Sequence, residues 1–203
     1  MSDVSTQLKK LVIASGNAGK IEEFRDYLAN LGVILIAKPD SIDVEEIGVT
    51  FIENAHLKAS QVAIATGEWA IADDSGLEVI ALNGAPGVLS ARYADTDRDR
   101  IDRVLQELGN QSNREAQFVC AIAIASPDGA IAADAIGICK GAIADAPRGN
   151  SGFGYDPIFL VPDLQQTFGE ISPEVKSQIS HRANALSILR SKLESLVAPH
   201  YSA

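Results

Sequence analysis

Short apolar runs alternate with segments of helical spacing along this chain, and this alternation limits its fold more than any other feature. Residues 11–14 form an apolar run, and Ile21, Phe24 and Leu28 then recur at the spacing of one helix face. A second apolar run follows at residues 33–36. The pattern predicts a strand, a helix and another strand, an order typical of α/β proteins.

The next segment repeats the alternation with a clear helix start. Thr50 and Glu53 have the spacing of a capping box, which predicts a helix that runs to about Thr66. Residues 69–72 are apolar and predict a buried strand. We expect this strand to stop at residues 73–76, because two acids and a glycine do not suit the continuation of a core strand.

The remaining residues predict further strands and helices. They comprise a turn at 84–87, a helix at 97–108, a hairpin of strands 118–125 and 130–139, a glycine-rich loop at 149–154, a strand at 158–160, a helix starting at 172–174 and a last helix after Ser180. The whole predicts a mixed α/β fold, a central sheet flanked by helices. We expect one domain over residues 1–198 and a frayed tail at 199–203.

Size and composition agree with one self-sufficient core. A chain of 203 residues with 46% hydrophobic content can bury roughly 70% of its unfolded surface, so it needs no disulfide. Cys120 and Cys139 lie in apolar runs without metal-ligand spacing, and we interpret both as buried structural thiols.

Charge and hydropathy limit the partners. A net charge of -10 opposes the counterion release that binds polymeric nucleic acid, although a small phosphorylated ligand remains possible at a local cluster of cations. The longest apolar stretch, residues 118–125, is far shorter than the roughly 20 residues that span a bilayer. We therefore expect no nucleic acid polymer and no membrane as partner, and a cytoplasmic location.

The first candidate site is a loop between the first predicted strand and helix. It consists of Ser15, Gly16, Asn17, Ala18, Gly19 and Lys20. Glycines let the backbone approach an anion, and a helix N-terminus supplies N–H donors for phosphate. The loop is not a Walker P-loop, because Ala14 replaces the first glycine and Ile21 replaces the metal-binding Ser or Thr. An ordinary strand-to-helix turn is the alternative.

The second candidate site is a set of carboxylates. Glu45 and Glu46 lie in an acidic loop, and Asp73 and Asp74 follow an apolar run. Adjacent carboxylates repel each other, so a hard cation such as Mg²⁺ is a plausible partner. Side chains alternate along a strand, so only one of the two aspartates is expected to reach a ligand. A solvated loop is the alternative for the two glutamates.

Two further segments could contact the rest of a ligand. The first consists of Gly152, Phe153, Gly154, Tyr155, Asp156 and Pro157, where aromatic rings beside glycines suit a stacked base. A hydrophobic plug is the alternative for this loop. The second consists of Lys176, Ser180, His181 and Arg182, where cations at a helix start need a compensating anion or acceptor.

Together these segments resemble the HAM1-like inosine/xanthosine triphosphate pyrophosphatases. The resemblance covers nearly the whole chain and is carried by residues 15–20, 50–55, 71–77, 84–87, 90–93, 152–157 and 180–182. It implies two lobes with an active-site cleft between them, a homodimer, and Mg²⁺-dependent hydrolysis of ITP, dITP and XTP to the monophosphate and pyrophosphate.

The resemblance also implies a role for each segment. Residues Ser15 to Lys20 would bind the triphosphate, with Lys20 stabilising the leaving pyrophosphate, and Glu45 and Asp74 would hold the metal. Asp74 would also act as general base, and Ser75 would contact the substrate. Phe153, Gly154, Tyr155, Asp156, Lys176, His181 and Arg182 would recognise the base.

Two other functions remain as alternatives. A Maf-like nucleotide pyrophosphatase shares the reaction, but its usual Ser-Pro-Arg-Arg signature is absent from the first loop. A non-catalytic nucleotide sensor would bind without cleaving. The combination of Lys20, Glu45 and Asp74 argues against a sensor, because binding alone requires no base beside a metal.

Overall fold

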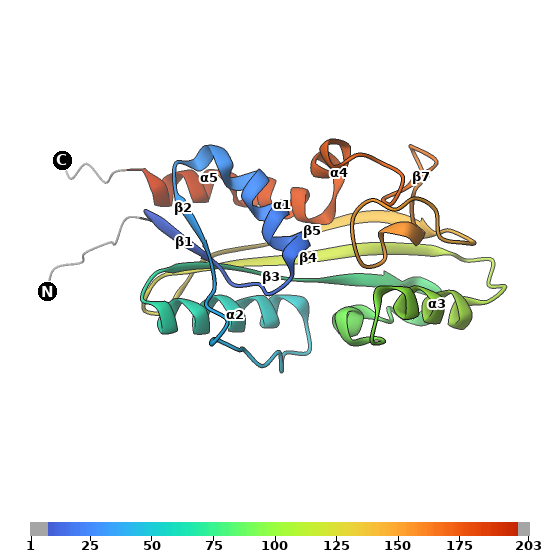
Figure 1. Cartoon of the computed structure of the whole chain (residues 1–203), viewed down its shortest axis with the longest axis horizontal. Helices are drawn as coiled ribbons and strands as arrows, with labels where there is room; N and C mark the ends of the chain where they lie inside the picture. Colours follow the sequence, from blue (N-terminus) through green and yellow to red (C-terminus); the bar gives the residue numbers. More distant parts are fainter. Residues whose placement is uncertain (1–7, 199–203) are drawn as a thin grey trace, which may run out of the picture. The chain divides into compact units, whose positions relative to one another are not determined.

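A computed structural model describes residues 8–198, which form a mixed α/β fold around a seven-stranded sheet of order β2-β1-β3-β4-β5-β6-β7 (Figure 1). The strands are β1 (Lys10–Ile13), β2 (Ile34–Ala37), β3 (Trp69–Val79), β4 (Glu115–Ala125), β5 (Ile131–Ile143), β6 (Phe159–Val161) and β7 (Gln166–Thr167). The α-helices are α1 (Ala18–Leu28), α2 (Phe51–Thr66), α3 (Asp97–Leu108), α4 (Pro173–Ile179) and α5 (His181–Val197). The predicted mixed α/β fold with a central sheet flanked by helices is confirmed, whereas two lobes with a cleft between them stay a prediction. The predicted tail at 199–203 lies outside the described residues.

The described residues divide into two compact units. The first contains residues 8–73, 121–135 and 185–198, and the second contains residues 74–120 and 136–184. The borders fall inside β3, β4 and β5, so each of these strands contributes to both units. One domain over residues 1–198 stays a prediction.

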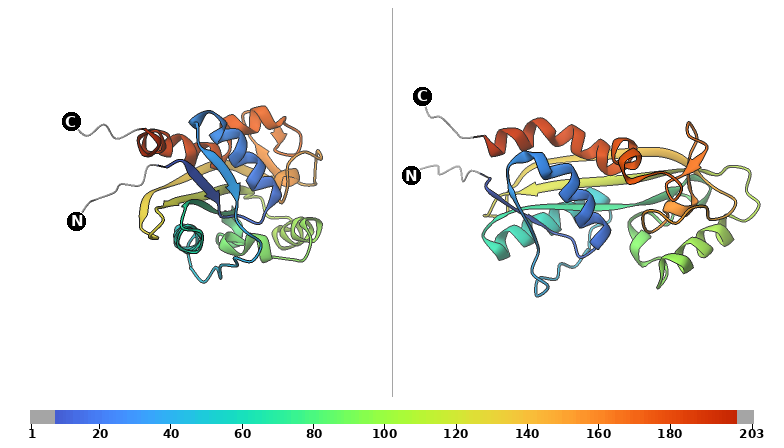
Figure 2. Two further views of the ribbon diagram at one scale, coloured as in Figure 1. Left: turned by 60° about the vertical axis from the view of Figure 1, so that its left-hand side comes forward. Right: turned by 45° about the horizontal axis from the view of Figure 1, so that its top comes forward.

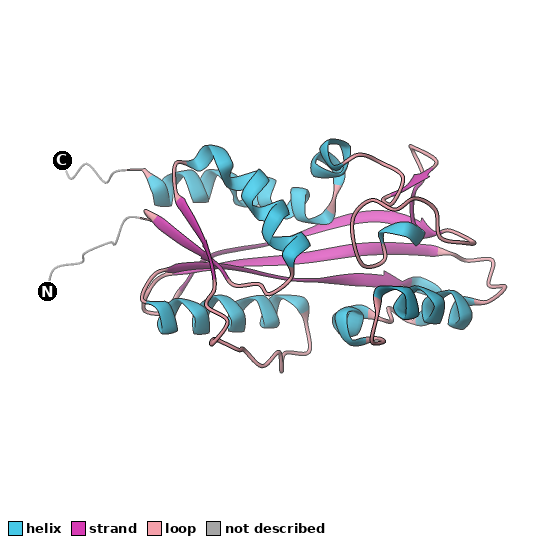
Figure 3. Ribbon diagram, viewed as in Figure 1, coloured by secondary structure: helices cyan, strands magenta, loops and turns pink. Residues whose placement is uncertain are grey.

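The first unit is layered around parallel strands. β1 pairs in parallel with β2 and with β3, and Leu11 lies opposite Leu35 on one side and Trp69 on the other. Parallel neighbours need a crossover, which α1 provides between β1 and β2, while α2 connects β2 to β3 on the other side of β1. All views place α2 on one side of the strands and α1 with α5 on the other (Figures 2 and 3). Both faces of β1 are therefore covered, which explains why its residues 11–13 are apolar and buried.

Helix α2 begins and ends where the sequence predicts. The Thr50 hydroxyl accepts the Glu53 N–H at 3.3 Å, and the Glu53 carboxylate accepts the Thr50 N–H at 3.2 Å. The same carboxylate accepts the Val49 N–H at 2.8 Å, which joins the preceding loop to the helix. Gly67, with a φ of 68°, ends the helix in the left-handed region. The predicted capping box is confirmed.

The predicted end of β3 is wrong. The strand continues through Asp73 and Asp74 to Val79, and both aspartates are buried, with 1% and 7% of their surface exposed. β3 pairs with β1 at Trp69 to Ile71 and has β4 as its neighbour on the other side, and the pairing of backbone groups does not depend on which side chains a strand carries. A strand in the middle of a sheet can therefore contain two acids if their charges are compensated locally.

The second unit is organised around an aromatic core. Phe118 of β4, Phe159 of β6 and Phe168 pack with ring centroids 4.5 to 5.8 Å apart. α3 lies on one side of the strands of this unit and α4 on the other (Figures 1 and 2). The apolar face of α3, with Ile101 and Val104 buried, contributes to the same core. The helix over residues 97–108 is confirmed at its predicted bounds.

The predicted hairpin and the two buried cysteines are confirmed. The hairpin has strands β4 and β5, longer than predicted, and the Ser126 N–H donates to the Ala130 carbonyl across its turn. Cys120 and Cys139 are buried thiols. Burial raises the pKa of Cys139 to about 11, so its thiol stays protonated and unreactive at neutral pH. Within residues 8–198, no helix is both long enough and apolar enough to cross a membrane.

Candidate active site

The loop between β1 and α1 is folded by its own polar side chains. The Asn17 N–H donates to Ser15 Oγ at 3.2 Å, and Asn17 Oδ1 accepts the Lys20 N–H at 3.1 Å as the N-cap of α1. Ala18, Gly19 and Lys20 therefore form the first turn of the helix, whose N–H groups have no partner within the helix itself. Gly16, Asn17 and Ala18 are exposed, so the helix N-terminus is accessible to an anion.

Lys20 joins this loop to the acidic pair of β3. Its Nζ lies 3.1 Å from Asp73 Oδ2, and the two side chains are 16% and 0% exposed. A buried carboxylate is costly unless a cation compensates it, which Lys20 provides. The structure thus brings together the predicted phosphate loop and Asp73, which positions the Lys20 ammonium. Asp74, the next residue of β3, is the other predicted site acid.

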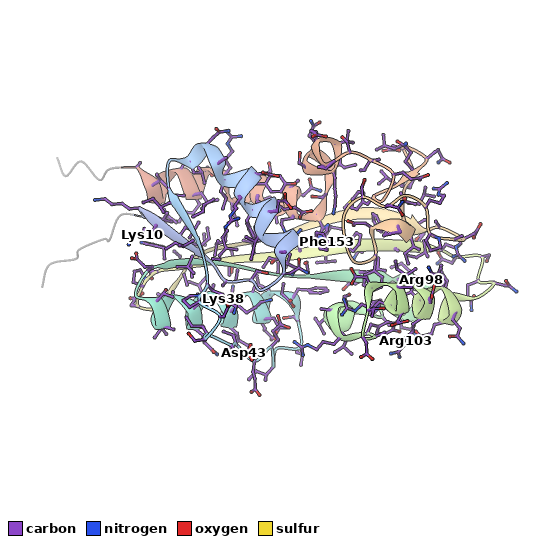
Figure 4. All side chains as sticks on the ribbon, in the orientation of Figure 1. Lys10, Lys38, Asp43, Arg98, Arg103 and Phe153 are labelled. Carbon is purple, nitrogen blue, oxygen red and sulfur yellow. The ribbon has the colours of Figure 1, made fainter. Side chains whose placement is uncertain are left out.

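The acidic loop before α2 is held by contacts that the sequence did not reveal. Glu46 Oε1 lies 2.7 Å from Lys58 Nζ, and Asn54 Oδ1 accepts the Gly48 N–H at 2.8 Å. Glu46 is thus engaged by a lysine of α2, whereas Glu45 is exposed. Figure 4 shows Lys38 and Asp43 along the same loop.

Lys58 is a functional candidate that sequence reasoning missed. This residue of α2 has a side chain that is only 12% exposed. Its ion pair with Glu46 joins it to the acidic loop. Residues 51–66 contain no other lysine or arginine, and a single cation in a largely apolar helix is a signal that could have identified it.

The carboxylates suit a metal ion that binds together with a phosphorylated ligand. Among residues 8–198, no three or more His, Cys, Asp or Glu side chains gather into a group able to hold a metal ion. Mg²⁺ needs less than this, because it usually binds to one or two carboxylates and completes its shell with water and substrate phosphates. The buried Asp74 is a ligand of the required kind.

In the second unit, one carboxylate organises the glycine-rich loop between β5 and β6. Asp156 Oδ2 accepts the Phe153 N–H at 2.9 Å and the Lys176 ammonium at 2.6 Å. Lys176 Nζ also lies 4.6 Å from the centroid of the Phe153 ring, which is labelled in Figure 4. Lys176 is in the last turn of α4 rather than in a first turn, so the favourable end of the helix dipole, together with Asp156, compensates its charge.

Tyr155 anchors the same loop to the scaffold. Its hydroxyl donates to the Ser90 carbonyl at 2.9 Å, while Ser90 Oγ accepts the Leu77 N–H of β3 at 2.9 Å and donates to the Gly87 carbonyl. Burial raises the pKa of Tyr155 above its usual value, so the phenol stays a donor at neutral pH. The segments 84–87 and 90–93, singled out from the sequence, thus support the loop.

His181 and Arg182 begin α5 and are both buried. The His181 ring stacks on Phe118 with centroids 4.7 Å apart, and the Ser180 hydroxyl accepts the Ala183 N–H as a cap. Arg182 is 0% exposed, and its Nη2 donates to Ser75 Oγ at 3.1 Å. The structure therefore brings together Arg182 and Ser75, which directly follows Asp74 in β3.

Comparison with known proteins decides the family. Residues 11–192 match the Ham1 family. This chain belongs to the Ham1 family. It is 58% identical over 190 residues to the dITP/XTP pyrophosphatase of Nostoc sp., a match that covers 94% of this chain and 97% of the relative. It is 55% identical over 179 residues to the dITP/XTP pyrophosphatase of Synechocystis sp., covering 88% and 92%.

Solved structures agree with this membership of the Ham1 family. The Ham1 protein of Staphylococcus aureus has a TM-score of 0.82 at 48% identity, covering 92% of this chain and 99% of that one. A HAM1 protein from Coxiella burnetii has a TM-score of 0.85 at 44% identity, covering 93% and 100%. The resemblance inferred from the sequence motifs is confirmed.

The glycine-rich loop leads to a prediction about its packing. Gly152 has a φ of +75°, and a Cβ there would lie 1.9 Å from Asp156 Oδ2, displacing the carboxylate from both Phe153 and Lys176. We expect Gly152→Ala to lower the free energy of unfolding by about 2 kcal/mol or more. Urea-induced unfolding measures the change.

Gly154→Ala is the matched control for this prediction. Gly154 also has a positive φ, +60°, but nothing lies within 4 Å of its added Cβ. Its substitution should cost only the strain of a left-handed alanine, about 1 kcal/mol. Equal losses in the two variants would show that the contact with Asp156 does not matter to stability.

Proposed function

We propose that this Ham1-family chain is a hydrolase that converts the non-canonical purine nucleoside triphosphates ITP, dITP and XTP to the monophosphate and pyrophosphate. The observation that carries the proposal is the 3.1 Å contact between Lys20 Nζ, from the candidate phosphate loop, and the buried Asp73, which Asp74 follows in β3. The relatives named dITP/XTP pyrophosphatase support dITP and XTP as substrates.

In this proposal the first unit binds the triphosphate. The exposed N-terminus of α1 supplies backbone donors, and Lys20 supplies a positive charge held in place by Asp73. Cleavage between the α- and β-phosphates builds negative charge on the departing pyrophosphate. A cation that is already oriented stabilises this charge without reorganisation in the transition state. Lys58 is a further cation available on α2.

Asp74 is the proposed general base. It orients a water molecule, takes its proton, and directs the resulting oxygen nucleophile at the α-phosphorus. The resemblance to the family assigns the water to Asp74, and Lys20 contacts its neighbour Asp73. The burial of Asp74 is consistent with a base that works in a site from which most water is excluded.

The proposed cofactor is Mg²⁺, with Asp74 and the exposed Glu45 as the residues that would hold it. When bound, Mg²⁺ neutralises charge on phosphate oxygens and polarises the phosphorus toward attack. A homodimer, implied by the resemblance to the family, and a cytoplasmic location, expected from the short apolar stretches of the sequence, stay predictions.

The second unit is proposed to recognise the base. The Phe153 ring offers a stacking surface, and the guanidinium of Arg182 carries five N–H donors, enough to bond Ser75 and a purine carbonyl together. ITP and XTP present a carbonyl at the purine 6-position where ATP presents an amino group. A buried donor that faces another donor loses its hydrogen bond, and the site then rejects ATP.

The first prediction of this proposal concerns substrates. With Mg²⁺ present, the protein should release pyrophosphate from ITP, dITP and XTP at least about 10²-fold more efficiently, in kcat/KM, than from ATP. A panel that also contains GTP and modified pyrimidine triphosphates, assayed with and without Mg²⁺, tests it. Preference for the pyrimidines would favour the Maf-like alternative, and binding without turnover would favour a sensor.

The second prediction concerns the general base. Asp74→Asn keeps the size of the side chain but removes its basicity, and should lower kcat for ITP by about 10²-fold or more while nucleotide binding stays measurable. Asp163→Asn, exposed in the loop after β6, is the control and should keep the kcat of the parent protein. Near-normal turnover by Asp74→Asn would remove this residue from the mechanism.

The third prediction concerns base selectivity. Truncating the fully buried Arg182 to alanine would leave a large cavity, so Arg182→Lys is the sharper test because it keeps charge and length but loses the fork of donors. It should narrow the ITP-to-ATP ratio of kcat/KM by about tenfold. If a folded variant keeps the ITP-to-ATP ratio of the parent protein, groups other than Arg182 recognise the base.

A further inference from the structure

A carboxylate from α3 is bonded to the glycine-rich loop of the second unit. Asp97 Oδ2 accepts the Gly154 N–H at 2.8 Å, across 57 residues of sequence. From the sequence, Asp97 is only the first residue of an amphipathic helix. Its role in the fold of the loop arises from tertiary structure alone.

The Asp97 carboxylate is held at both of its oxygens. Asp97 Oδ1 lies 2.8 Å from Arg100 Nη1, and Arg100 Nε donates to the Ala94 carbonyl at 2.9 Å. The start of α3 is itself fixed, because the Thr96 hydroxyl caps the helix by accepting the Asp99 N–H at 3.1 Å. The acceptor that faces Gly154 is therefore attached to a rigid helix end.

Two carboxylates consequently fix the two peptide groups on either side of Phe153. The Phe153 N–H, in the preceding peptide, donates to Asp156, and the Gly154 N–H, in the following peptide, donates to Asp97. When both flanking peptide planes are held, the φ and ψ angles of Phe153 have little freedom, and these angles set where its ring can lie. The Lys176 ammonium lies over the ring, 4.6 Å from its centroid.

We propose that Asp97 is a positioning residue of this enzyme: it holds the Gly154 amide and so orients the Phe153 ring for stacking on the substrate's base. The inference rests on the proposed function, since it takes the base of a nucleoside triphosphate as the ligand of the ring. Asp97 itself touches no reacting atom. Its loss therefore affects affinity for the base and leaves the chemistry at phosphorus nearly unchanged.

The test is steady-state hydrolysis of ITP by Asp97→Ala with Mg²⁺ present. We expect KM to rise by about tenfold, the loss typical of one hydrogen bond to a charged group, and kcat to stay within about threefold of the parent value. Inorganic tripolyphosphate lacks a base, so its inhibition constant should not change. A general disturbance of the fold would instead weaken inhibition by tripolyphosphate and lower kcat as well.

Asp102→Ala is the matched control on the same helix. Asp102 is also partly exposed and also paired with an arginine, with its Oδ2 2.9 Å from Arg98 Nε, one turn along α3. Figure 4 labels Arg98 on this helix. The control should leave KM, kcat and tripolyphosphate inhibition at the parent values, which separates the contact with Gly154 from a mere loss of charge on α3.

A conservative variant and a measurement without substrate complete the test. Asp97→Asn keeps one oxygen acceptor for Gly154 and should bring KM back to within about threefold of the parent value. Hydrogen exchange of the peptide covering residues 149–156 should be faster in Asp97→Ala than in Asp102→Ala.

The outcomes separate the two proposals. If the parent protein hydrolyses ITP and Asp97→Ala has the parent KM, the inference is overturned while the function stands. If the parent protein does not hydrolyse the purine triphosphates, the proposed function fails, and exchange at residues 149–156 still reports whether Asp97 holds the loop. Unchanged exchange in Asp97→Ala would overturn the inference by itself.

Discussion

A carboxylate inside a buried strand is costly unless a cation or hydrogen-bond donors compensate it, and β3 carries two in succession. Lys20 compensates the first of them, Asp73, from the opening turn of α1. This contact requires β1, the loop after it and β3 to be neighbours, which the parallel pairing of β1 with β3 ensures. The loop after β1 and the buried Asp73 of β3 therefore support one another through this contact.

In the second unit, contacts with distant residues hold the glycine-rich loop in one conformation. Glycines give the loop its tight, left-handed turns but would leave it mobile. Asp156, Tyr155 and Asp97 each attach it to a different partner, namely Lys176, the Ser90 carbonyl and the end of α3. These contacts hold the loop in one conformation in the folded protein, as the proposed base-binding role requires.

Local signals made much of the fold predictable. Three of these signals involve only neighbouring residues and can be recognised directly in the sequence. They are the capping box at Thr50, the amphipathic helix at 97–108 and the serine cap at residue 180. The end of β3 was mispredicted for the opposite reason. The local rule that acids end a core strand ignores the neighbouring strands and Lys20, which come from elsewhere in the chain.

The amino-acid sequence alone determined the family, the order of strands and helices in outline, and the candidate residues for the proposed site, because these follow from short motifs and periodicity. Only the tertiary structure decided which of those residues meet. It paired Lys20 with Asp73, Lys58 with Glu46 and Asp97 with Gly154, and it buried Arg182 against Ser75. The physical reason is range: propensity and capping act over a few residues, whereas ion pairs and hydrogen bonds between distant segments exist only after the strands and helices have packed.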